Sequence, residues 1–192
     1  MNGRRIILAF IVVAFVVIFS ILIFSIDWGG GSRPPVVRQV NISDLANTDT
    51  KVRMTARNII NNNQEHQQLE VIVGRDSTVG TLINGYQGNV VRTEQTTSNQ
   101  EAYQAFLSAL HNADFTSQQI PPKGVQYDGA CPKGTRYTFE FIGGKDTPKS
   151  TWATSCGKKI GNFAGDLSLT RALFRAQLPE AQFRALTNDT QF

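Results

Sequence analysis

The two cysteines, Cys131 and Cys156, are the residues of this chain whose chemistry the sequence constrains most. Paired thiols form a disulfide in an oxidising compartment, whereas an unpaired thiolate is a nucleophile. Nucleophilic catalysis also requires a base and an orienting group, and the sequence contains no G-x-S-x-G elbow or similar motif. We therefore predict a Cys131–Cys156 disulfide and expect no catalytic residue.

The two histidines could in principle bind a metal ion. His66 lies in a polar turn and His111 at the end of a predicted helix, and neither has another ligand at a characteristic spacing. We interpret both as solvated surface side chains. The aspartates also lack the spacing of a calcium-binding loop, so we expect no metal ion and no cofactor.

The cysteines flank a predicted hairpin. Residues 135–142 (TRYTFEFI) alternate aromatic and polar side chains, and residues 150–155 can return as a partner strand after two glycines. A tight turn at those glycines would place Cys131 opposite Cys156. A longer loop would shift this register, and Pro132 interrupts pairing, so the geometry favours the disulfide without requiring it.

Two further hairpins and two helices are expected. Alternating residues predict strands over 51–60 and 69–73, and Asn84-Gly85 predicts a type I′ turn between strands over 79–83 and 86–92.

The Ser98-x-x-Glu101 capping box begins a predicted amphipathic helix over residues 99–111. Asp166 is predicted to cap a helix over 167–177, followed by a short helical segment over 180–186. The expected inward stripe of the 167–177 helix is Leu169, Ala172, Leu173 and Ala176. The predicted fold is α+β, a mainly antiparallel sheet of about five or six strands with two helices on one face.

An apolar segment at residues 6–26 has no charged residue, and about 20 apolar residues suffice to cross a bilayer as a helix. Arg4 and Arg5 precede it, which favours a cytoplasmic N-terminus at residues 1–5 and an outside C-terminal domain. A cleaved signal peptide is the alternative, but the segment exceeds the usual length of about 7–15 residues and lacks a small-x-small cleavage site. We predict a retained single span, a Gly/Pro tether at residues 27–35 and one extracytoplasmic domain at residues 36–192.

The charge argues against a nucleic-acid partner. The chain has 19 basic and 15 acidic residues, and without the topogenic Arg4 and Arg5 the balance is 17 against 15. This small excess is not concentrated in a basic run. We expect no nucleic-acid partner and predict no small-molecule ligand.

Three segments carry a family resemblance: residues 128–137 (DGACPKGTRY), residues 152–156 (WATSC) and residues 173–179 (LFRAQLP). With them the chain resembles uncharacterised single-pass membrane-anchored proteins of candidate-phylum, Saccharibacteria-like bacteria, over roughly its C-terminal half. The resemblance implies a location at the bacterial cytoplasmic membrane and two paired cysteines. It implies no activity.

These observations favour a non-enzymatic extracytoplasmic domain that binds or scaffolds another protein of the bacterial cell envelope. One version of this hypothesis is an accessory subunit of a secretion, conjugation or pilus machine. The alternative is an envelope enzyme such as a cell-wall hydrolase, whose acid and base would come from residues far apart in the sequence.

Overall fold

The computed structural model describes residues 42–143, 150–157 and 160–187. They belong to the compact unit formed by residues 39–192. The predicted transmembrane helix at 6–26 and the predicted tether at 27–35 lie outside the described residues. Within the described part of the chain, no helix combines the length and the apolar character needed to cross a bilayer.

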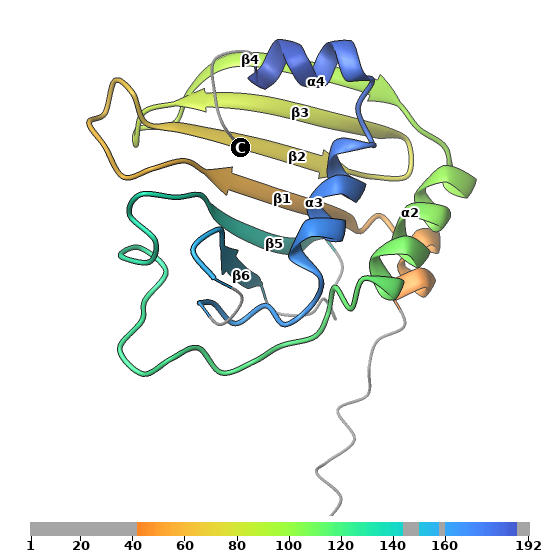
Figure 1. The fold of residues 1–192 in the computed structure, drawn as a ribbon. Coiled ribbons are helices and arrows are strands. Elements are labelled where there is room, and N and C mark those ends of the chain that lie inside the picture. The colour runs from red at the N-terminus through yellow and green to blue at the C-terminus, as the bar shows by residue number, and fades with distance from the viewer. Residues whose placement is uncertain (1–41, 144–149, 158–159, 188–192) are drawn as a thin grey trace, which may run out of the picture. The chain divides into compact units, whose positions relative to one another are not determined.

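A six-stranded antiparallel sheet forms the centre of the domain (Figure 1). Its strands are β1 (Lys51–Arg57), β2 (Gln67–Val73), β3 (Ser77–Asn84), β4 (Asn89–Thr97), β5 (Arg136–Ile142) and β6 (Thr151–Thr154). Their spatial order is β4-β3-β2-β1-β5-β6, so β5 pairs with the side of β1 that the β1 to β4 meander leaves open. The predicted α+β class with a mainly antiparallel sheet is confirmed.

The two faces of the sheet differ in polarity because side chains alternate along each strand. In β1, Val52, Met54 and Ala56 are buried on the inner face, against the helices. On the outer face, Arg53 hydrogen-bonds the carboxylates of Glu70 on β2 and Glu140 on β5. Burial lowers the pKa of Arg53, but these two carboxylates raise it above its ordinary value, so the cross-strand ion pair stays charged.

The turn between β3 and β4 differs from the predicted two-residue turn. Asn84 pairs with Asn89, which leaves a four-residue loop from Gly85 to Gly88. Both of these glycines have positive φ, 71° and 81°. The second glycine, together with an irregularity in the β3–β4 register after Leu82, moves the start of β4 beyond the expected Tyr86.

Helix α2 (Gln100–Asn112) lies at one end of the sheet, beside the short 3-10 helix η1 (Ile42–Asn47) (Figure 1). Its N-cap is Asn99, whose side chain accepts a hydrogen bond from the Ala102 backbone at 2.8 Å. The predicted cap, Ser98, instead donates its backbone N–H to the Asp76 carbonyl. The predicted aromatic inward face is confirmed, since Tyr103 and Phe106 are buried.

Helix α3 (Leu167–Arg175) crosses the inner face, and α4 (Glu180–Thr187) covers β3 and β4 (Figure 1). Asp166 caps α3 as predicted, accepting from the Leu169 backbone at 3.0 Å. The predicted inward stripe was wrong: Leu169 is 42% exposed, whereas Thr170 and Phe174 are fully buried. The helix turns its one aromatic residue toward the core, because that side chain buries the most apolar surface.

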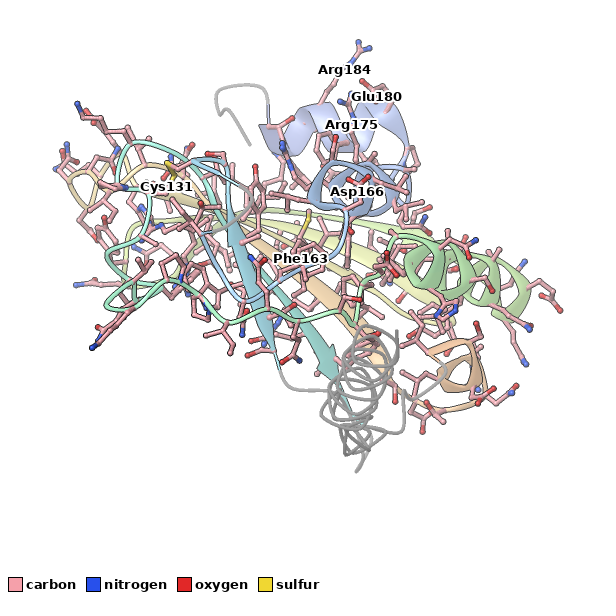
Figure 2. All side chains as sticks on the ribbon, turned by 60° about the horizontal axis from the view of Figure 1, so that its bottom comes forward. Cys131, Phe163, Asp166, Arg175, Glu180 and Arg184 are labelled. Carbon is pink, nitrogen blue, oxygen red and sulfur yellow. A yellow bond between two sulfur atoms is a disulfide. The ribbon has the colours of Figure 1, made fainter. Side chains whose placement is uncertain are left out.

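Glu180, at the start of α4, pairs with Arg175 at the end of α3 and with Arg184 one turn further along α4 (Figure 2). Glu180 accepts hydrogen bonds from both arginines at 3.0 Å, and these bonds lower the pKa of its exposed carboxyl.

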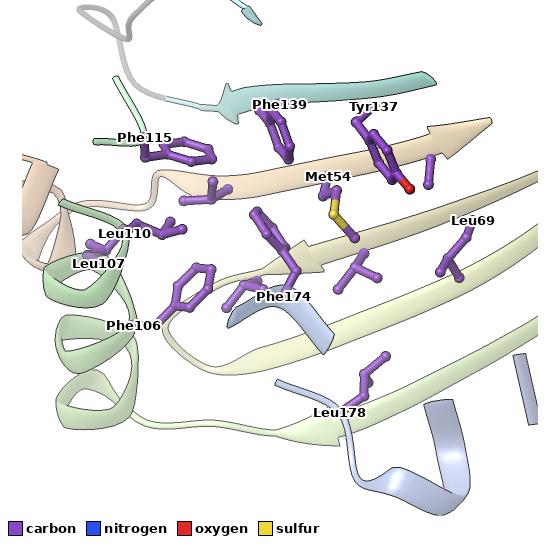
Figure 3. Packing of buried hydrophobic residues seen from close by; sticks show 14 of the residues in the cluster. Met54, Leu69, Phe106, Leu107, Leu110, Phe115, Tyr137, Phe139, Phe174 and Leu178 are labelled. Carbon is purple, nitrogen blue, oxygen red and sulfur yellow. The ribbon is translucent and has the colours of Figure 1, made fainter. Parts of the chain in front are cut away.

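An aromatic cluster fills the space between the sheet, α2 and α3 (Figure 3). The Phe174 ring centroid lies 5.3 Å from that of Phe106 on α2 and 6.2 Å from that of Phe139 on β5. Phe115, in the segment that follows α2, packs edge-on against Phe139 at 5.5 Å. Three separate parts of the chain therefore meet at one set of rings.

Candidate functional site

Cys131 and Cys156 form a disulfide in the structure, with Cα atoms 5.7 Å apart (Figure 2). The register of the flanking strands differs from the tight hairpin considered above, because Tyr137 pairs with Ala153 and not with Ser150. The loop between β5 and β6 is therefore longer than two residues. A disulfide at this position is compatible with an oxidising environment, and neither sulfur is a free thiol.

A pocket of about 560 Å³ lies where β1 ends and β5 begins. These two strand ends are at the left of the sheet in Figure 1. We call it the Arg57–Arg136 pocket. Its lining comes from β1, β2, β3, β5, the β3–β4 turn and the loops beside them: Arg57, Ile60, His66, Gln68, Ile83, Gly85, Tyr86, Gln87, Gly88, Asp128 and Arg136.

Arg57 and Arg136 are direct partners in the β1–β5 register. Both guanidinium groups lie over the ring of Tyr127, with their central carbons 5.6 and 5.9 Å from its centroid. Like charges in directly opposed positions destabilise a sheet. None of the ion pairs found among the described residues includes either arginine.

Arg136 is only 4% exposed. Its two terminal nitrogens donate to backbone carbonyls, to Asp128 at 3.1 Å and to Asn58 at 3.2 Å. Its buried Nε has no hydrogen-bond partner within the described part of the chain. Carbonyl oxygens satisfy these N–H groups but do not neutralise the positive charge of the guanidinium. Among the described residues, no carboxylate contacts this buried cation directly.

His66 lines the pocket together with these arginines. Its ring stacks on Tyr86 with centroids 4.0 Å apart and planes inclined by 5°. Its Nδ1 lies 3.3 Å from the Ile59 carbonyl oxygen. The expectation of a solvated His66 was wrong, because it is 2% exposed, whereas His111 is exposed as predicted.

The pKa of His66 predicts a dependence of stability on pH. Burial lowers this pKa below the ordinary 6.5, and the positive charges of Arg136 and Arg57 lower it further, against the opposing effect of the Ile59 carbonyl. The unfolded chain therefore binds the proton more readily than the folded chain. The free energy of unfolding should fall as the pH drops below 6.5 and level off below the folded pKa.

Denaturant unfolding at pH 7.5 and at pH values down to 5 measures this loss. His66→Phe retains an aromatic ring against Tyr86 but cannot titrate, and it should remove this part of the pH dependence. An unchanged profile in that variant would refute the role of His66.

A second cavity, of about 240 Å³, lies between the sheet and helices α3 and α4. Arg171 and Arg175 line it, together with apolar residues that include Met54 and Leu69. Arg171 stacks on the Tyr137 ring at 4.7 Å, and Arg175 is paired with Glu180. This cavity is smaller, and one of its two cations already has a carboxylate partner.

Comparison with protein-family models and with curated proteins finds no match for this chain. The site therefore rests on its own geometry. Among the described residues, no group of three or more His, Cys, Asp or Glu side chains is placed to hold a metal ion.

Sequence reasoning considered His66 only as a possible metal ligand and did not single out the two arginines of the pocket. Arg57 and Arg136 are ordinary polar residues of two alternating strands, and they are far apart in the chain. Their pairing depends on β5 joining β1, a long-range choice that local patterns do not encode. The sequence does show an arginine at the last position of β1 and another at the first position of β5. These positions indicate a pair only once the β1–β5 register is known.

Proposed function

We propose that this protein is a membrane-anchored domain on the outer face of a bacterial cytoplasmic membrane, with a non-enzymatic role in binding another envelope protein. Its single span would be residues 6–26 and its N-terminus would lie inside. An accessory subunit of a secretion, conjugation or pilus machine is the form of this proposal that the anchor-plus-domain plan favours. The Cys131–Cys156 disulfide supports an extracytoplasmic location.

Exposed apolar side chains around the Arg57–Arg136 pocket carry this proposal. Ile60 and Tyr86 line the pocket and are 41% and 55% exposed. Val90, 63% exposed, pairs with the lining residue Ile83 across the β3–β4 register. Ile59 and Val91, the chain neighbours of Ile60 and Val90, are 44% and 58% exposed. A cluster of exposed apolar residues next to polar ones is typical of a protein-binding surface.

Thiol labelling in intact cells tests the location. A membrane-impermeant thiol reagent should label Cys131 and Cys156 only after reduction, because both thiols are oxidised outside the membrane. Labelling that requires permeabilised cells would place the domain in the cytoplasm and refute this part of the proposal.

Site-specific photocrosslinking tests the binding role. A photoreactive amino acid at Val90 of the full-length protein should give one discrete product in the native membrane. The same substitution at Leu169, which is also exposed but lies on α3, is the matched control and should give none. Equal crosslinking from both positions, or none from Val90, would refute an interaction at this end of the sheet.

A further inference from the structure

We infer that the Arg57–Arg136 pocket recognises a carboxylate on a peptide segment of the partner protein. This inference rests on the proposed binding function and specifies the chemistry of the contact. Its basis is a pair of arginines that are direct partners on neighbouring strands and that, among the described residues, form no ion pair with a carboxylate.

The charge of the lining determines the class of anion. The pocket is lined by two arginines and one acidic residue, Asp128, while His66 is neutral near pH 7 because its pKa is lowered. Two positive charges and one negative charge leave one positive charge. A single carboxylate balances this charge, whereas a phosphate dianion would exceed it.

The terminal nitrogens of Arg57 provide the direct contact. Its Nε is engaged by the Gln68 side chain at 2.7 Å, and its terminal nitrogens make no hydrogen bond to a described residue. A planar guanidinium presents paired N–H groups that match the two oxygens of a carboxylate. Arg136 lies deeper and acts mainly through its charge, because its own terminal nitrogens already bind carbonyls.

The remaining lining indicates a peptide. Ile60, Ile83 and Tyr86 provide apolar surface beside the arginines. A residue with an apolar side chain next to the carboxylate would cover this surface and exclude water from the ion pair, which strengthens it. The pocket volume of about 560 Å³ lies within the range of roughly 300–1,000 Å³ that is usual for ligand-binding pockets.

The probes are two peptides that differ in one group. Acetyl-Phe-Glu-Phe-amide carries a side-chain carboxylate, and acetyl-Phe-Gln-Phe-amide has the same shape without charge. Each peptide is titrated into the full-length protein in detergent micelles, and binding is followed by the Nε–H signals of the arginines in NMR spectra. The glutamine peptide should bind at least about tenfold more weakly, because it lacks a charge-assisted contact.

Arg57→Gln is the decisive variant, and Arg92→Gln is its matched control. Arg92 pairs with the inner-face residue Leu82 and is not among the residues that line the pocket. Arg92→Gln removes one positive charge, as Arg57→Gln does, but leaves the pocket intact. Arg57→Gln should abolish the preference for the glutamate peptide, Arg57→Lys should retain part of it, and Arg92→Gln should leave it unchanged. Arg136→Met is not a suitable variant, because it removes two buried hydrogen bonds and destabilises the fold.

Further probes distinguish the source of the anion. Acetyl-Val-Phe with a free terminal carboxylate tests a chain end, acetate tests a free small carboxylate, and inorganic phosphate tests a different anion. Tighter binding of phosphate or acetate than of both acidic peptides would overturn the inference. Equal affinity for the glutamate and glutamine peptides would also overturn it.

Failure of this inference can be distinguished from failure of the proposed function. If the Val90 crosslink persists in Arg57→Gln, the domain binds a partner without using the pocket, and only the carboxylate inference fails. If the crosslink disappears in Arg57→Gln but not in Arg92→Gln, both proposals are supported. Absence of the crosslink in the unmodified chain would count against the proposed function itself.

Discussion

Phe174→Ala is expected to lower the free energy of unfolding of the domain by about 3–5 kcal/mol, the usual cost of truncating a buried phenylalanine. Phe174 is 0% exposed, and its ring contacts Phe106 of α2 and Phe139 of β5. Its loss leaves a cavity where two helices and the sheet meet. Denaturant unfolding of the full-length protein in detergent micelles, followed by near-ultraviolet circular dichroism, measures the change.

Leu169→Ala is the matched control, because Leu169 lies on the same helix and is 42% exposed. Its cost should stay below about 1 kcal/mol, since truncations of exposed residues change stability little. Phe174→Leu should fall between the two. Equal costs for Phe174→Ala and Leu169→Ala would contradict the assignment of Phe174 to the inward face of α3 and of Leu169 to its exposed face.

The strands could be predicted from the sequence because their patterns are local. Residues 135–142 alternate aromatic and polar side chains, and the structure places β5 at Arg136–Ile142. The strand predicted over residues 51–60 alternates in the same way, and its first part, Lys51–Arg57, forms β1. Period-two alternation needs no knowledge of the rest of the chain. Each of these strands presents its apolar side chains to the helices.

The inward face of α3 could not be predicted in the same way. Leu169 and Leu173 form an apolar stripe at helical spacing, but Thr170 and Phe174 form a competing stripe one residue further on. Which stripe faces the sheet depends on the shape of the aromatic cluster around Phe139, and that cluster is assembled from distant segments. The choice is therefore a tertiary one.

The environment of His66 was missed for a related reason. The polar residues around it predict an exposed turn, and the turn does form, since the His66 N–H donates to the Asn62 carbonyl at 3.0 Å. The imidazole is nevertheless covered by Tyr86, which comes from the β3–β4 loop. A contact between two loops leaves no periodic signal, so only the folded structure shows that His66 is buried.

Removal of the disulfide by Cys131→Ala with Cys156→Ala is expected to cost about 3 kcal/mol in the free energy of unfolding. The two cysteines are 25 residues apart, and closing a loop of this length lowers the entropy of the unfolded chain by about that amount. Denaturant unfolding of the full-length protein in micelles measures the loss. Reduction of the unmodified protein should reproduce it.

The single variants provide the internal control for the disulfide. Because the bond needs both sulfurs, Cys131→Ala and Cys156→Ala should each lower the free energy of unfolding as much as the double variant does. If the two side chains acted only through independent packing, the costs of the single variants would instead add up to that of the double variant.

The disulfide also fixes the segment that carries Tyr127 and Asp128, which the Arg57–Arg136 pocket requires. The double variant should therefore bind the glutamate peptide more weakly even under conditions where it is fully folded. Additive costs, or unchanged binding by the folded double variant, would show that the disulfide does not hold this segment in place.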